Sequence, residues 1–204
     1  MTKTTSEPPK RITIAISGAS GAAYAVRLLE ALIERECKVY LTISRPASLV
    51  LQHELGLAVD LNHFSVAQLT KLEAPRVSYY HYDDISAPIA SGSFPVDAMI
   101  VVPCSMSTLA GVAAGLGTNL ILRAAQVTLK ERRPLILVPR ETPLGLIELE
   151  NMRKAARAGA CILPAAPAFY HNPKTLDDII DFMVVKALSQ LGIEVGRTRW
   201  GAGA

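Results

Sequence analysis

The sequence predicts a single α/β domain in which helices cover both faces of a doubly wound, mainly parallel sheet. Short apolar segments alternate along the chain with amphipathic helical patterns, which is the order typical of such three-layer sheets. The first apolar segment holds Ile12, Ile14 and Ile16, runs into a turn of small residues, and is followed at once by a helical pattern. We expect the domain to span residues 11–192, between a polar tail at 1–10 and a C-terminal tail at 193–204.

Composition narrows the class of protein. Of the 204 residues, 50% are apolar and only 19% are charged, and the low share of charge predicts that an oligomer covers part of the surface. A net charge of +3 without a basic block gives no reason to expect nucleic acid. The three cysteines lack a C-x-x-C pattern, which favours reduced thiols in the cytoplasm. No apolar run is long enough to span a membrane.

The remaining elements follow in alternation. Further strands are predicted at 38–43, 76–81, 98–102, 135–138 and 161–163. Helices are predicted after the first turn, from Pro46, after Thr108, at 148–158, and as a short piece at 66–72. Two more are marked by their caps: one at 120–132 follows Asn119, and one runs to Leu191 from the capping box of Thr175 and Asp178.

The turn after the first strand is a candidate anion site. Gly18, Ala19 and Ser20 lie between a strand and a helix N-terminus, where unpaired N–H groups and the helix dipole favour a phosphate. The alternative is a tight turn with no ligand. The spacing is not G-x-G-x-x-G, and no acidic residue ends the next strand, so the pattern does not indicate NAD. Ser44 ends the second strand, either as a ligand or as a helix cap.

A second polar cradle follows the strand at 98–102. The hydroxyls of Ser105, Ser107 and Thr108 enter a helix N-terminus, with Met106 among them. Cys104 is interpreted as a small buried residue, because no histidine lies nearby in the sequence to activate its thiol.

Cations are predicted to gather at the carboxyl edge of the sheet. Arg140 and Glu141 follow a strand end, as a functional pair or as a salt bridge without a chemical role. Arg123 and Lys130 are seven residues apart and share a helix face, and we expect them at the same edge. The histidines show no ligand spacing, so the pattern favours a metal-free mechanism that holds anions and moves one proton.

Several ordered motifs make the chain resemble the flavin prenyltransferases of the UbiX/Pad type over residues 11–200. They are ITIAISGASGA, the SGSF of 91–94, PCS at 103–105, the run from Arg123 through PRETP, LENM at 149–152, LPAAPAFYH at 163–171 and RW at 199–200. The resemblance implies a flavodoxin-like or Rossmann-like domain in a homododecamer. It further implies that dimethylallyl phosphate and reduced FMN are joined at flavin N5 and C6, and that the product serves UbiD-type decarboxylases, for example in ubiquinone biosynthesis.

The resemblance also implies roles for particular residues. The FMN-binding residues would be Gly18, Ala19, Ser20, Ser44, Ser105, Met106, Ser107, Thr108 and Arg140. The residues binding the prenyl phosphate would be Arg123, Lys130, Tyr170, Lys186 and Trp200, the last closing the pocket from a neighbouring subunit. Glu141, relayed through Ser20, is the expected acid–base group, and Glu54 matches a site carboxylate.

One position departs from the family pattern. Lys186 stands where relatives usually carry an arginine, so the charge is kept and the planar two-point fork is lost.

Two alternative functions share the fold: a flavin-dependent decarboxylase of cysteine-type substrates, and an FMN carrier without activity. The histidines are not placed in the motif of the former, and the surplus of cations argues against the latter.

Overall fold

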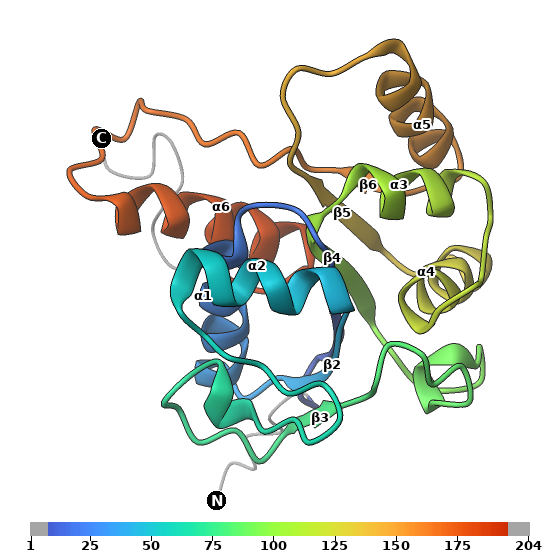
Figure 1. Ribbon diagram of the computed structural model, residues 1–204, viewed down its shortest axis with the longest axis horizontal. Coiled ribbons are helices and arrows are strands. Elements are labelled where there is room, and N and C mark those ends of the chain that lie inside the picture. The colour runs from blue at the N-terminus through green and yellow to red at the C-terminus, as the bar shows by residue number, and fades with distance from the viewer. Residues whose placement is uncertain (1–7, 196–204) are drawn as a thin grey trace, which may run out of the picture.

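The computed structural model describes residues 8–195, which form one twisted parallel sheet of six strands (Figure 1). The strand order is β3-β2-β1-β4-β5-β6, so the direction of winding reverses between β1 and β4. The strands are β1 (Arg11–Ile16), β2 (Lys38–Ile43), β3 (Val77–Tyr79), β4 (Ala98–Cys104), β5 (Leu135–Pro139) and β6 (Cys161–Ile162). This order is that of a Rossmann-type sheet and confirms the predicted fold class.

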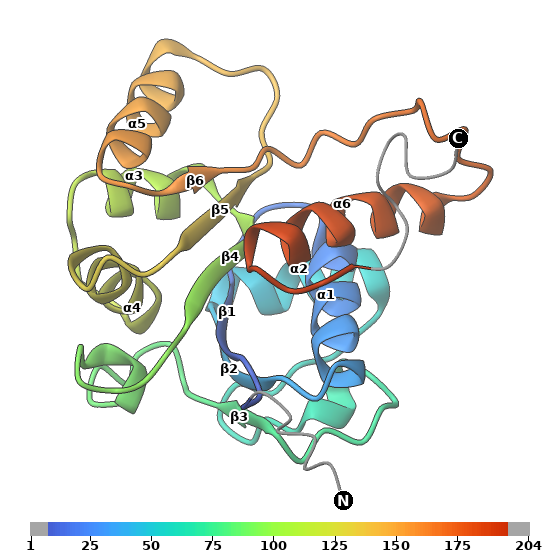
Figure 2. The same cartoon turned by 180° about the vertical axis from the view of Figure 1, so that it is seen from behind.

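Helices cover both faces of the sheet. Figures 1 and 2 show α1, α2 and α6 on one side of the molecule and α3, α4 and α5 on the other. The helices are α1 (Ala22–Glu34), α2 (Arg45–Leu55), α3 (Met106–Ala113), α4 (Leu120–Lys130), α5 (Leu146–Arg157) and α6 (Leu176–Gln190), with single 3-10 turns η1 (Val66–Gln68) and η2 (Pro88–Ala90). Two consecutive helices, α3 and α4, therefore connect β4 to β5.

Successive side chains along each strand point to opposite faces of the sheet, so the hydrophobic core has two parts. Ile12, Ile14 and Ile16 pack with residues of α1 and α6 on one face, whereas Ala15 and Met99 pack against α3 and α4 on the other. Both faces of the central strands are buried, as expected for a parallel sheet. Each fully buried isoleucine contributes about 1.5–3 kcal/mol through the hydrophobic effect.

Most predicted elements are present, and two are shorter than predicted. The helix expected at 66–72 is a single turn, because the chain leaves it at Thr70, whose hydroxyl donates to Glu30 of α1 at 2.8 Å. The strand expected at 76–81 is reduced to β3, which lies at the sheet edge and pairs with β2 alone. Caps at Asn119 and Thr175 are confirmed, the latter as a capping box with Asp178.

The ends of the domain are partly described. Lys38 donates its backbone N–H to the carbonyl oxygen of Lys10 at 2.8 Å, so pairing begins one residue before the expected boundary. Ile193 and Val195 pack against the core of their own subunit. Trp200 and the rest of the C-terminal tail lie outside the described residues, and docking of that tail on a neighbour stays a prediction.

Candidate functional site

The site is built at the carboxyl ends of β1 and β4, where the strand order reverses. Ser17 joins these two ends: its hydroxyl donates to the carbonyl oxygen of Pro103 at 2.9 Å and accepts from the N–H of Ser105 at 2.8 Å. Ser17 is buried, so these bonds fix the spacing between the two turns. A crevice at this reversal is where open α/β sheets bind ligands.

The turn after β1 depends on its glycines. A Cβ on Gly18 would lie 2.3 Å from the Cβ of Pro46, so this turn packs directly on the first turn of α2. Gly21 has φ +107°, a backbone conformation that favours glycine, and it caps α1. The small residues here allow the close approach of α2 as well as of a ligand.

The N-terminus of α1 already holds an anion. The carboxylate of Glu54 accepts from the N–H of Gly21 at 3.0 Å and from the N–H of Ala22 at 2.9 Å. In this structure a side-chain carboxylate from α2 therefore occupies the first-turn N–H groups that were expected to face a phosphate, and a phosphate at this turn stays a prediction. The positive end of the α1 dipole stabilises this carboxylate.

Glu54 is held in its ionised form. Burial opposes ionisation, but hydrogen bonds from the Ser20 hydroxyl and from the N–H groups of Ala22 and Gly21, together with the charge of Arg140, outweigh it and lower the pKa of Glu54. Ser20 thus pairs with Glu54. No hydrogen bond joins Ser20 to Glu141 among residues 8–195; the exposed carboxylate of Glu141 accepts from the N–H of Thr142 at 3.0 Å, and the relay stays a prediction.

The N-terminus of α3 carries the second cradle. Ser105 caps the helix by accepting from the N–H of Thr108 at 3.3 Å, and its hydroxyl lies 3.1 Å from that of Ser107. The N–H groups of Met106 and Ser107 have no partner within the helix, because first-turn N–H groups never do. Together with the hydroxyls they provide donors for one anion.

Arg140 supplies the charge of this cradle. Its backbone N–H donates to the carbonyl oxygen of Cys104 at 3.4 Å, which places it between the ends of β4 and β5. Its Nε is buried and has no hydrogen-bond partner among residues 8–195. Within the same residues Arg140 forms no ion pair with Glu141, so the salt-bridge alternative fails. A buried, unpartnered guanidinium N–H is costly unless a ligand uses it.

Two neighbouring residues have structural roles. Ser44 caps α2 by accepting from the N–H of Ala47 at 3.2 Å, so its role as a helix cap is confirmed. Burial raises the pKa of the Cys104 thiol to about 12, which fits the interpretation as a small buried residue.

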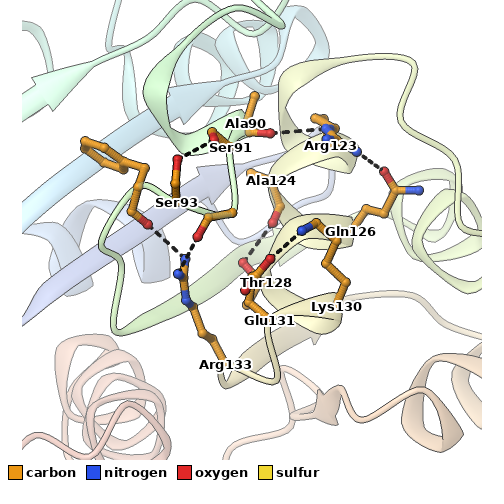
Figure 3. Close-up of polar contacts among 12 residues, drawn as sticks. Ala90, Ser91, Ser93, Arg123, Ala124, Gln126, Thr128, Lys130, Glu131 and Arg133 are labelled. Atoms are coloured by element: carbon orange, nitrogen blue, oxygen red, sulfur yellow. Dashed lines mark hydrogen bonds and ion pairs between the residues drawn. The ribbon is translucent and has the colours of Figure 1, made fainter.

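Arg123 and Lys130 lie beside the segment that precedes β4, and a place for either residue at the ligand site stays a prediction. Arg123 donates from Nε to the carbonyl oxygen of Ala90 at 3.2 Å, and Lys130 pairs with Glu131 against Gly92 (Figure 3). Both therefore border segment 90–94, which leads into the start of β4.

Tyr170 and Lys186 come together around one aromatic ring. The ring of Phe182 on α6 meets that of Tyr170 edge-on at 5.8 Å and stacks on His171 at 5.0 Å. The ammonium of Lys186 lies 5.5 Å from the centre of the same ring. The sequence argument had missed Phe182, although its position one turn before Lys186 was a usable signal.

Within the described part of the chain, no group of three or more His, Cys, Asp or Glu side chains is arranged to hold a metal ion. Likewise, none of the helices between residues 8 and 195 has the length and apolar character needed to cross a membrane.

Comparison with known proteins identifies the family to which this chain belongs. The family model described as Flavoprotein matches residues 1–188. Flavin prenyltransferase UbiX of Halalkalibacterium halodurans is 49% identical, over 93% of this chain and 92% of its own. That of Pseudomonas aeruginosa is 48% identical, over 95% of each chain. The chain belongs to the Flavoprotein family and, within it, to the flavin prenyltransferases of the UbiX type.

A solved structure agrees with this assignment. AnUbiX (PadA1), in complex with FMN and dimethylallyl pyrophosphate, superposes with a TM-score of 0.84 at 39% identity, covering 95% of this chain and 98% of its own. A dodecameric FMN-dependent UbiX-like decarboxylase of Escherichia coli superposes with a TM-score of 0.81 at 40% identity, covering 93% and 99%.

The clamp of Glu54 on α1 makes stability depend on pH. We expect Glu54→Gln to lower the free energy of unfolding at pH 7 by about 1 kcal/mol, the usual worth of an exposed helix cap. Because the pKa of Glu54 is lowered on folding, its contribution is present above the ordinary value of 4.5 and is lost as pH falls through the lowered one. The difference between wild type and variant should therefore vanish in acid.

Denaturant unfolding between pH 3 and 7, at one protein concentration, measures this difference. Glu73→Gln, which removes an exposed carboxylate elsewhere, is the matched control. A difference that persists at pH 3 would show that Glu54 acts by packing and not by charge.

Proposed function

We propose that the chain transfers a dimethylallyl group from dimethylallyl phosphate to N5 and C6 of reduced FMN, releasing inorganic phosphate and forming prenylated FMN. The observation that carries the proposal is the buried, unpartnered Nε of Arg140 beside the hydroxyl cradle of α3. A guanidinium whose buried Nε has no hydrogen-bond partner among residues 8–195, next to a helix N-terminus, fits a flavin phosphate. The family membership supports the same conclusion.

FMN would be held at the reversal of the strand order. The proposed contacts are Gly18, Ala19, Ser20, Ser44, Ser105, Met106, Ser107, Thr108 and Arg140, all at or next to strand ends. Because Glu54 fills the N-terminus of α1, we assign the phosphate to α3 and the turn 18–20 to the rest of the flavin. When bound, the reduced flavin supplies the two nucleophilic atoms of the reaction.

The prenyl phosphate would be gripped by cations that neutralise the departing charge. Tyr170 and Lys186 are supplied by the cluster around Phe182. Arg123 contacts Ala90 and Lys130 borders Gly92, and within residues 8–195 neither contacts the cluster around Phe182, so we propose that both reach the site of a neighbouring subunit in a dodecamer. Fixed cations aimed at the leaving phosphate lower the barrier without a metal ion.

Proton transfer is assigned to Glu141, and Glu54 is assigned to the turn after β1. Glu141 is exposed at the end of β5 and can protonate the leaving phosphate or accept the proton from flavin C6. The pair of Ser20 and Glu54 orients the turn through the bonds already described. We keep Glu141 as the acid–base group and assign Ser20 to Glu54.

Lys186 is proposed to determine the affinity for dimethylallyl phosphate. An ammonium donates as a point charge, whereas a guanidinium forms two parallel bonds to a phosphate. We expect Lys186→Arg to lower the KM for dimethylallyl phosphate several-fold with kcat little changed. Steady-state kinetics at saturating FMN measure this, and an unchanged or higher KM would contradict it.

The function itself is tested by anaerobic incubation with reduced FMN and dimethylallyl phosphate, followed by mass spectrometry of the extracted flavin. We expect a gain of one C5 unit, lost in Glu141→Gln. Tight binding of FMN that is never alkylated would overturn the proposal in favour of a flavin carrier. We further propose that the reaction takes place in the cytoplasm and that a UbiD-type decarboxylase receives the product, which purified decarboxylase activated by the reaction mixture would test.

A further inference from the structure

The way in which Arg123 is held has no role in the assignments above. Its Nε donates to the carbonyl oxygen of Ala90 at 3.2 Å, and its Nη1 donates to Oε1 of Gln126 at 2.7 Å (Figure 3). Gln126 in turn donates from Nε2 to the carbonyl oxygen of Gly115 at 3.1 Å. The guanidinium is thus fixed by α4 itself, by η2 and, through Gln126, by the connection between α3 and α4.

All of these partners are neutral, which distinguishes Arg123 from Lys130 on the same helix. Lys130 pairs with the carboxylate of Glu131, and Arg133 gives its two terminal nitrogens to the carbonyl oxygens of Gly92 and Phe94. No ion pair within residues 8–195 includes Arg123. It therefore keeps its full charge, with two of its five N–H groups engaged by described residues.

The amide of Gln126 is held at both of its ends by hydrogen bonds. It is half-buried, and a Cβ on Gly117 would lie 3.4 Å from its Oε1 and 3.7 Å from the Cδ of Arg123. Its amide uses both of its functions, one as acceptor for Arg123 and one as donor to Gly115. A glutamate of the same length could accept from Arg123, but it would neutralise the charge and leave the carbonyl oxygen of Gly115 without this donor.

We propose that Gln126 is a positioning residue, which aims Arg123 at the prenyl phosphate while leaving its charge uncompensated. The inference rests on the proposed function, in which Arg123 binds that phosphate. A neutral acceptor fixes the orientation of the guanidinium without weakening its electrostatic field. A carboxylate beside the guanidinium would instead cancel most of its attraction for a substrate anion.

Equilibrium binding tests the inference without turnover. Calorimetry measures the Kd of dimethylallyl phosphate for the oligomer loaded with oxidised FMN. We expect Gln126→Glu to raise this Kd about tenfold, the order set by one charge-assisted hydrogen bond, with the Kd of FMN unchanged. Gln68→Glu, which makes the same change of charge on η1, should leave both constants as in wild type.

A double-mutant cycle decides the matter even if Gln126→Glu fails to assemble. Gln126→Met keeps the length of the side chain and cannot ionise; we expect it to raise the Kd about threefold in wild type and not at all in an Arg123→Met background. An equal effect in both backgrounds, or Gln126→Glu binding as tightly as wild type, overturns the inference. If wild type itself neither binds dimethylallyl phosphate nor prenylates FMN, the proposed function fails instead.

Discussion

Arg140→Met is expected to weaken FMN binding at least a hundredfold while leaving the flavin-free protein as stable as wild type or slightly more stable. The guanidinium is proposed to give two charge-assisted bonds to the flavin, each worth about 1.5–3 kcal/mol, and their loss accounts for the weaker binding. The flavin-free protein should not lose stability, because the buried Nε of Arg140 has no hydrogen-bond partner within the described chain. Methionine fills a similar volume and removes this unsatisfied donor.

Quenching of flavin fluorescence on titration gives the Kd, and thermal unfolding without flavin gives the stability. Arg140→Lys should bind FMN with an intermediate Kd, because it keeps the charge and loses the fork. Arg157→Met, at the exposed end of α5, is the control for loss of one arginine. FMN affinity within twofold of wild type in Arg140→Met would remove Arg140 from the site.

Mixing two inactive variants is expected to restore activity. Arg123→Met and Arg140→Met should each prenylate FMN very poorly, since one weakens the grip on the phosphate and the other the hold on flavin. If a site takes Arg140 from one subunit and Arg123 from another, random co-assembly leaves about a quarter of the sites with both residues intact. The placement of Arg123 against Ala90 is the structural basis of this expectation.

Co-expression with two different affinity tags, followed by sequential purification, isolates the mixed oligomers for assay. Arg140→Met mixed with a chain that carries both substitutions is the control, because no site in that mixture can be complete. Mixed oligomers that are as inactive as their parents would mean that Arg123 acts within its own subunit or takes no part in catalysis.

Local signals in the sequence were sufficient for most of the fold. β-branched alternation located the strands around Ile14, and small polar caps located the starts of α2, α4 and α6. The serine cradle was also predictable, because hydroxyls that follow a buried strand fall at one edge of a parallel sheet. Ser17 was missed, although it follows β1 directly, as Ser44 follows β2 and Ser105 follows β4.

Contacts between distant residues were beyond such signals. The bond between Glu54 and Gly21 joins residues 33 apart in the chain, and it depends on how α2 crosses the turn after β1. The bond between Arg123 and Ala90 joins residues 33 apart, and it depends on how α4 packs against η2. Helical spacing fixes which residues share a face, and tertiary packing decides where that face points.

The carboxylate at the start of α1 also explains how this sheet avoids the best-known ligands of its strand order. Dinucleotides lay their pyrophosphate on the helix that follows the first strand, where the N–H groups point at it. Here Glu54 occupies that position as a built-in counterion and would repel a second anion. The chain therefore keeps the strand order of the nucleotide-binding folds but places a carboxylate where a dinucleotide would lay its pyrophosphate.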